Sequence, residues 1–214
     1  MSLSPWYDRH YWWRGVINTR EGRVGEAIAD LTAAIRRLPE MSLFYLDRAE
    51  AFLKAGRWTE LVADLSTAAD MDYKLTGKVA DLGAAELLAG VRRAEAADPK
   101  DHRAPAWTGF LLMRAGNYAE AAAALERSIA LDSSWAWPHA WLAQVALHSG
   151  RADRALSLLD EAGRRRAEHP EDRYWRGAAL LQLGRRADAG AELDRCLALD
   201  PKNDEARSLR ETLR

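Results

Sequence analysis

The feature that most constrains this chain is a ladder of glycines at regular spacing. Successive glycines of the ladder are 34 residues apart at every step except one, which is 26 residues. The six glycines are Gly22, Gly56, Gly90, Gly116, Gly150 and Gly184. A fixed period of this length is typical of a tandem array, in which each unit packs on its neighbours and no single central core is needed.

Other residue types recur at fixed distances from each ladder glycine. A small residue stands seven positions before it, where two helices can approach closely: Gly15, Ala49, Gly83, Gly109, Ala143 and Gly177. Nine positions after the glycine, five copies carry a leucine that marks the buried stripe of a second helix: Leu31, Leu65, Leu125, Leu159 and Leu193. Each copy therefore predicts two helices that are joined by a turn at the glycine.

The segments GNYAEA at 116–121 and LDP at 199–201 show the pattern most completely. A 34-residue helix-turn-helix with these residues resembles the tetratricopeptide repeat family, over about residues 8–203. The resemblance implies an all-α, right-handed α-solenoid that forms a single array over 1–214. We expect about six repeats and a C-terminal capping helix, at 8–41, 42–75, 76–101, 102–135, 136–169, 170–203 and 204–214.

The third unit, 76–101, is eight residues shorter than the others. Residues 78–89 fit a normal first helix, whereas only 91–97 remain for a second helix before Asp98-Pro99. We therefore expect a truncated second helix. One interpretation is a tolerated deletion in a solenoid, and the other is a bend in the array or a seam between repeats two and four.

Composition excludes several classes of partner. Charged residues make up 29% of the 214 residues and the net charge is -1, so we expect neither nucleic acid nor anionic lipid as a partner. No run of 18 apolar residues exists, and the first ten residues lack the basic-then-apolar order of a signal peptide. The sequence thus predicts a soluble, cytoplasmic protein without a membrane span.

Motifs for chemistry are sparse. Cys196 is the only cysteine and lies on the apolar stripe of the last repeat, which predicts a small buried side chain rather than a nucleophile. The five histidines have no metal-ligand spacing, and no glycine-rich phosphate loop or GxSxG motif is present. We expect no enzymatic activity, no catalytic residues, no metal and no cofactor.

The resemblance implies that the first helices line a concave groove, in which peptide segments of partner proteins usually lie. Positions 13, 10, 9, 6 and 2 before each ladder glycine fall on one stripe of the first helix. Tryptophan stands nine positions before the glycine in four copies, where the family commonly has an asparagine. The predicted groove residues on this stripe are Trp12, Trp13, Trp107, Phe110, Trp137, Trp141, Tyr174 and Trp175.

Two interpretations of these rings stay open: they bind a ligand, or they wedge between adjacent repeats. We expect the repeated tryptophans to be recognition anchors, because the leucines of both helices can close each hairpin without them. Family members that clamp the C-terminal carboxylate of chaperones carry lysine, arginine and asparagine along the stripe. Here the matching residues are Trp12, Val16 and Asp47, so an acidic C-terminal tail would find few donors.

The sequence therefore predicts a protein-protein interaction scaffold that binds a peptide or protein segment in an aromatic-lined groove. A first alternative is the regulatory or targeting domain of a larger enzyme. A second is a glycan-binding surface, since the faces of tryptophan rings stack on sugars. An unfilled aromatic patch also favours self-association.

Overall fold

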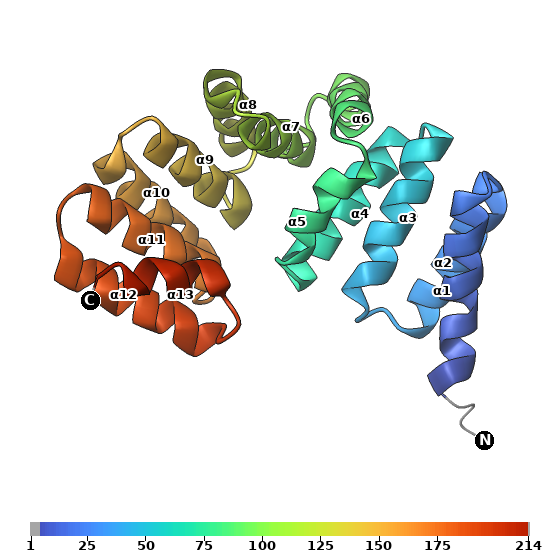
Figure 1. The fold of residues 1–214 in the computed structure, drawn as a ribbon. Helices are drawn as coiled ribbons and strands as arrows, with labels where there is room; N and C mark the ends of the chain where they lie inside the picture. Colours follow the sequence, from blue (N-terminus) through green and yellow to red (C-terminus); the bar gives the residue numbers. More distant parts are fainter. Residues whose placement is uncertain (1–4, 214) are drawn as a thin grey trace. The chain divides into compact units, whose positions relative to one another are not determined.

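The computed structural model describes residues 5–213, without the side chains of residues 5–8 and 80. Every regular element in these residues is a helix, and no strand occurs among them (Figure 1), which confirms the expected all-α fold. Arg214, the last residue of the expected capping helix, lies outside the described residues. The chain divides into two compact units, Met1–Trp107 and Thr108–Arg214, and each is described by itself.

Unit 1 is built from two complete helical hairpins and an irregular third one. Its elements are α1 (Pro5–Arg20), α2 (Val24–Arg37), α3 (Ser42–Ala55), α4 (Trp58–Met71), α5 (Leu75–Val79), the 3-10 helix η1 (Ala80–Leu82), α6 (Ala84–Ala97) and the start of α7 (Arg103–Arg114). Unit 2 contains the rest of α7, α8 (Tyr118–Leu131), α9 (Ala136–His148), α10 (Ala152–Arg165), α11 (Pro170–Gln182), α12 (Arg186–Leu199) and α13 (Asp204–Glu211).

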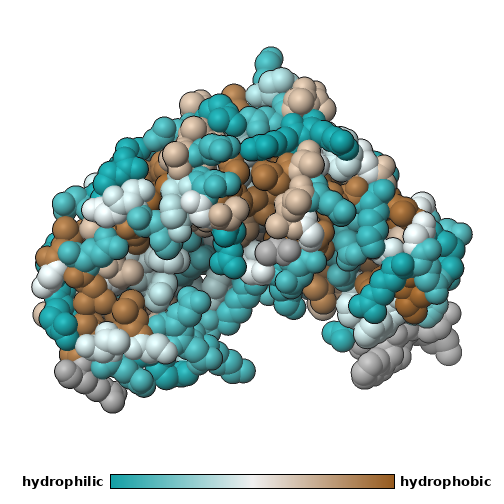
Figure 2. Space-filling view, turned by 45° about the horizontal axis from the view of Figure 1, so that its top comes forward, coloured by the Kyte–Doolittle hydropathy of each residue, from teal (hydrophilic) through white to brown (hydrophobic). Residues whose placement is uncertain are grey.

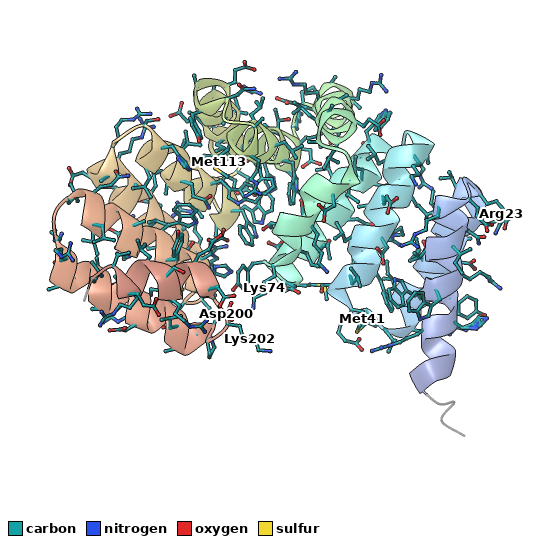
Figure 3. All side chains as sticks on the ribbon, viewed as in Figure 1. Arg23, Met41, Lys74, Met113, Asp200 and Lys202 are labelled. Carbon is teal, nitrogen blue, oxygen red and sulfur yellow. The ribbon has the colours of Figure 1, made fainter. Side chains whose placement is uncertain are left out.

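The turns repeat in chemistry as well as in spacing. Inside the hairpins, five ladder glycines adopt a left-handed conformation, as Gly56 does at φ 69°. Between repeats, an aspartate side chain accepts a hydrogen bond from the backbone N–H two residues later, which fixes the entry into the next helix. The five aspartates that do this are Asp72, Asp98, Asp101, Asp132 and Asp200, the last of which is labelled in Figure 3.

In three hairpins, at Gly15, Gly109 and Gly177, the first helix approaches a leucine of the second helix closely. A Cβ added to Gly15 would lie 2.6 Å from Leu31 Cγ, and one added to Gly177 would lie 2.9 Å from Leu193 Cγ. Leu31 and Leu193 are fully buried. The predicted pairing of a small residue on the first helix with a leucine on the second is thus confirmed in these hairpins.

The third repeat differs from the prediction. Its first helix is reduced to the five residues of α5 and the three of η1, whereas the second helix, α6, has its full 14 residues. The expected helix over 78–89 and the expected stub over 91–97 are both wrong. The buried residues Leu87 and Val91 of α6 stand 26 positions after Leu61 and Leu65 of α4, so the eight missing residues lie before α6.

Gly90 is therefore not a turn glycine but a packing position inside α6. A Cβ at this residue would lie 3.0 Å from Cε3 and Cζ3 of the Trp58 ring. Gly83 is the residue that breaks the chain, since it precedes α6 at φ 92°. Gly90 has the spacing of a turn glycine, yet its lack of a side chain leaves room for the Trp58 indole.

An ion pair recurs with the same period in unit 1. Arg14 Nε donates to Asp30 Oδ2 at 2.7 Å, and Arg48 Nε donates to Asp64 Oδ2 at 2.7 Å, 34 residues later. Both pairs join the first helix of a hairpin to its second helix. Burial raises the pKa of Asp64, and the hydrogen bond from Arg48 opposes that shift.

We predict that Gly15→Ala destabilises the protein by about 1–3 kcal/mol, because the new methyl group overpacks the contact with Leu31. Gly25→Ala in the same hairpin is the matched control, because nothing lies within 4 Å of a Cβ at that position. We expect this control to be neutral or to stabilise α2 by up to about 1 kcal/mol. Urea unfolding followed by circular dichroism checks both, and equal stability of the two variants would contradict the close-approach argument.

Candidate functional site

The tryptophans nine positions before the glycine are not equivalent in the structure. Trp107 and Trp141 are 0% and 1% exposed and are the largest fully buried side chains among the described residues. Trp107 Nε1 donates a hydrogen bond to Ser66 Oγ at 2.9 Å, which satisfies its buried N–H. The expectation that these rings are surplus to folding is wrong for this pair, because both are part of the packed interior.

In unit 2 the remaining rings of α7 and α9 gather around Trp141. The Phe110 ring centroid lies 4.7 Å from that of Trp141. The Trp137 ring stacks on the Trp141 ring, with centroids 5.4 Å apart. Both Phe110 and Trp137 are buried. The Arg166 guanidinium covers Trp137 at 4.3 Å from its centroid, so a ligand has no access to this ring either.

Helix α9 is buried almost completely. Twelve of its 13 residues, Ala136 to Leu147, are buried, including the stripe positions Trp137, Trp141 and Gln144. A helix that is apolar around its whole circumference is typical of a core element, not of a groove lining. The predicted groove is therefore closed at α9.

In unit 1, Trp12 is half-buried and packs between the first two hairpins. Its ring stacks on Phe44 at 5.3 Å, and its Nε1 donates to Asp47 Oδ2 at 2.5 Å. Burial raises the pKa of Asp47, while the hydrogen bond from Trp12 acts in the opposite direction. Trp12 thus has a structural role, and Asp47 is its acceptor.

Trp13 is the one predicted groove tryptophan that is open to solvent. Its side chain is 57% exposed, and its ring packs only partly on Trp12, with centroids 4.5 Å apart. Ile17, one turn later on the same face of α1, is 49% exposed. This pair gives unit 1 an apolar ridge at the surface.

In unit 2, Tyr174 and Trp175 on α11 are half-buried, with ring centroids 4.9 Å apart. Trp175 packs against the core around Ala143 and Ala179. Tyr174 lines an open pocket of about 580 Å³ between α11 and α13. The other residues that line this pocket are Asp204, Glu205, Ser208, Leu209 and Thr212.

The repeat register explains this pocket. Glu205, Ser208, Leu209 and Thr212 stand 34 positions after Glu171, Tyr174, Trp175 and Ala178. Helix α13 therefore occupies the place of a first helix, and its stripe continues the stripe of α11. Helix α13 is therefore more than the expected cap, and the 34-residue offset is the sequence signal that identifies its stripe residues.

Glu171 is a second residue that the sequence interpretation did not single out. It lies on the α11 stripe, and its Oε2 is buried without a hydrogen-bond donor among the described residues. Burial raises the pKa of Glu171 to about 7, and Arg166 and hydrogen bonds with Trp175 and Gln144 oppose the shift. Next to it, burial and the charge of Arg166 lower the pKa of His169 to about 4.

Other chemistry is limited within residues 5–213. No three side chains of His, Cys, Asp or Glu gather closely enough there to hold a metal ion. None of the helices in that range is long and apolar enough to cross a membrane. Cys196 is buried as predicted, and its burial raises the pKa of the thiol to about 11, which disfavours the nucleophilic thiolate.

Comparison with known families identifies the repeat. Three sequence models described as tetratricopeptide repeat match the chain at residues 19–72, 112–179 and 173–203. They cover both units and fall on the helical hairpins described above. The chain belongs to the tetratricopeptide repeat family.

Solved structures show the same fold at low identity. A tetratricopeptide repeat protein from Parabacteroides merdae is 15% identical, with 99% of this chain and 86% of that chain covered and a TM-score of 0.59. A thermophilic repeat protein of Thermus thermophilus is 18% identical, with 96% and 98% covered and a TM-score of 0.56. YrrB, described as a repeat protein with an unusual peptide-binding site, is 17% identical, with 85% and 97% covered and a TM-score of 0.55. No curated protein matches the sequence.

We predict that Trp141→Ala lowers the free energy of unfolding by about 3 kcal/mol or more, because it removes a fully buried indole and leaves a cavity. Trp13→Ala is the matched control, since the same truncation at an exposed site is expected to cost about 0.5 kcal/mol or less. Urea unfolding and quenching of tryptophan fluorescence measure the difference. An equal loss of stability in the two variants would contradict the assignment of Trp141 as a structural ring and Trp13 as an exposed one.

We also predict that Glu171→Gln makes stability less sensitive to pH. The folded pKa of Glu171 lies above its unfolded value, so its contribution is fully present below about pH 4.5 and is lost as pH rises through about 7. As pH rises from about 4.5 to about 7, the free energy of unfolding of the variant should thus increase by roughly 3 kcal/mol relative to that of the parent. His169 has the opposite dependence in both proteins, so the difference between the two unfolding curves isolates Glu171.

The matched control for this measurement is Glu168→Gln, at an exposed carboxylate three residues away that pairs with Arg173. Its unfolding curve should follow the parent's curve across the pH range. A Glu171→Gln variant whose stability stays parallel to the parent from pH 5 to 8 would contradict the buried-carboxyl assignment.

Proposed function

We propose that this protein is a non-enzymatic interaction scaffold that binds a peptide or protein segment in the stripe formed by α11 and α13. The observation that carries the proposal is the open pocket of about 580 Å³, whose lining residues occupy ligand-facing positions of two successive first helices. Of the predicted groove residues, Tyr174 is the one in this pocket, and Trp175 lies beside it. Membership in a family whose arrays present such a stripe supports the same function, as does the peptide-binding site in the description of YrrB.

The lining of the pocket favours a particular partner chemistry. Tyr174 and Leu209 supply apolar surface, while Asp204 and Glu205 supply negative charge. Such a site suits an aromatic or apolar anchor with a basic residue beside it, because the cation gains both from the carboxylates and from the ring face. An acidic C-terminal tail is disfavoured by the same carboxylates.

The burial of Trp107, Trp137 and Trp141 weakens the glycan alternative, because a sugar can stack only on an open ring face. The interaction function is compatible with a chain that works alone and with one that serves as a domain of a longer enzyme. In either case, the binding energy is expected to come from a few anchors rather than from the whole stripe.

The test is a displayed library of random linear peptides, screened against the whole chain. The affinity of the best peptide is then measured by fluorescence anisotropy for the parent and for Ser208→Trp, which fills the pocket from an exposed position on α13. We expect at least a tenfold loss of affinity, which corresponds to about 1.4 kcal/mol.

Ser157→Trp, at an exposed serine on α10, is the matched control and should bind the peptide as the parent does. Enriched peptides should contain an aromatic residue next to arginine or lysine. A library without binders, or equal binding by the two tryptophan variants, would contradict the proposed site.

A further inference from the structure

The exposed face of α1 lacks the cover that the same face has in the next repeat. Ile17 corresponds in register to Ala51 of α3, which is fully buried against Ala27 and Leu31 of the preceding hairpin. In α1, Trp13 and Ile17 are 57% and 49% exposed. This face therefore has the character of an inter-repeat contact surface.

Two cationic residues flank the apolar ridge. Arg9 and Arg20 lie one turn before and about two turns after Trp13, on the same side of α1 by helical periodicity, and both are exposed. No ion pair of either is found within the described part of the chain. We call Arg9, Trp13, Ile17 and Arg20 the N-face.

The pocket at the other end of the repeat series has the complementary character. We call it the C-pocket: Tyr174, Asp204, Glu205, Ser208, Leu209 and Thr212. Glu205 is exposed and makes no ion pair with the described residues, while Asp204 pairs with Arg207. The N-face thus presents an aromatic anchor between arginines, and the C-pocket is a shallow, open pocket with an apolar lining beside carboxylates.

We propose that the occupant of the C-pocket is the N-face of a second copy of this chain, with Trp13 as the anchor. This inference rests on the proposed binding function of the C-pocket and names its partner. An indole buries roughly 150–250 Å² of surface in such a contact. The opposite charges of the two surfaces orient the encounter. They also disfavour contacts between two N-faces or between two C-pockets.

The contact is head-to-tail rather than symmetric. Two N-faces packed together would bring Arg9 and Arg20 of both copies onto one apolar patch, and like-charge repulsion disfavours that arrangement. A heterologous contact either closes into a ring, of which two reciprocally paired copies are the smallest, or continues as an open chain. In either case each N-face is matched to the C-pocket of another copy, and the fraction of associated protein rises with protein concentration.

The test uses two variants that each disable one surface. Trp13→Ser removes the anchor at an exposed position, and Glu205→Arg places a positive charge at the C-pocket from an exposed position on α13. In sedimentation velocity over a concentration series, the parent should form oligomers whose population rises with protein concentration. Each variant alone should associate at least tenfold more weakly than the parent. High salt should also weaken the self-association of the parent, because it screens the charges of both surfaces.

Mixing the two variants is the decisive measurement. The intact N-face of Glu205→Arg should occupy the intact C-pocket of Trp13→Ser, which gives a one-to-one heterodimer that does not grow further. Met71→Ser, which removes another exposed apolar side chain of unit 1, is the control and should assemble like the parent. A mixture without heterodimer, a parent that stays monomeric, or a Trp13→Ser variant that assembles fully would each overturn the proposal.

Failure of this inference can be told apart from failure of the proposed function. Trp13→Ser keeps an intact C-pocket, so it should still bind the peptides selected from the displayed library. A monomeric parent that binds those peptides would refute only the self-association. A parent that forms the head-to-tail contact but selects no peptide would refute the proposed peptide-binding function and leave the self-association standing.

Discussion

The close contact between a glycine of the first helix and a leucine of the second is the constraint on which the hairpins α1–α2, α7–α8 and α11–α12 depend. At Gly15 and Gly177 the first helix approaches so closely that a methyl group would collide with Leu31 or Leu193. This approach fixes the distance between the two helices of a hairpin. Residues on the other faces of the first helix are then positioned by the helical period alone, and these faces form the inter-repeat contacts and the stripe.

The regular hairpins could be predicted from the sequence because glycine, leucine and the closing aspartate are all local signals of the same unit. The third repeat could not be predicted, because two glycines compete for the turn. Gly90 has the expected spacing but accommodates Trp58, whereas Gly83 has the left-handed backbone. A search for the second-helix pattern around Leu87 and Val91 would have found the deletion, since buried residues follow the true register.

For the candidate site, the sequence predicts which helical face a residue lies on but not whether that face is open. Trp13, Trp107 and Trp141 share one repeat position, yet the first is exposed and the other two are buried. Their environments depend on neighbouring helices: Ser66 satisfies the Trp107 N–H, and Phe110 covers Trp141. Such tertiary contacts are absent from a repeat alignment within one chain, so the stripe alone could not separate structural rings from accessible ones.

A solenoid buries in each internal repeat the surface that its end repeats expose. Ala51 is covered by the preceding hairpin, whereas Ile17 at the same position of α1 has no such cover. Likewise α13 extends the stripe of α11 into an open pocket, because it stands in the place of a first helix. Figure 2 shows brown apolar residues at the surface in separate patches within a mostly teal, hydrophilic exterior. Since α9 is almost completely buried, the stripe surface that stays open lies on α1 and in the α11–α13 pocket, and the proposed recognition function rests on these two places.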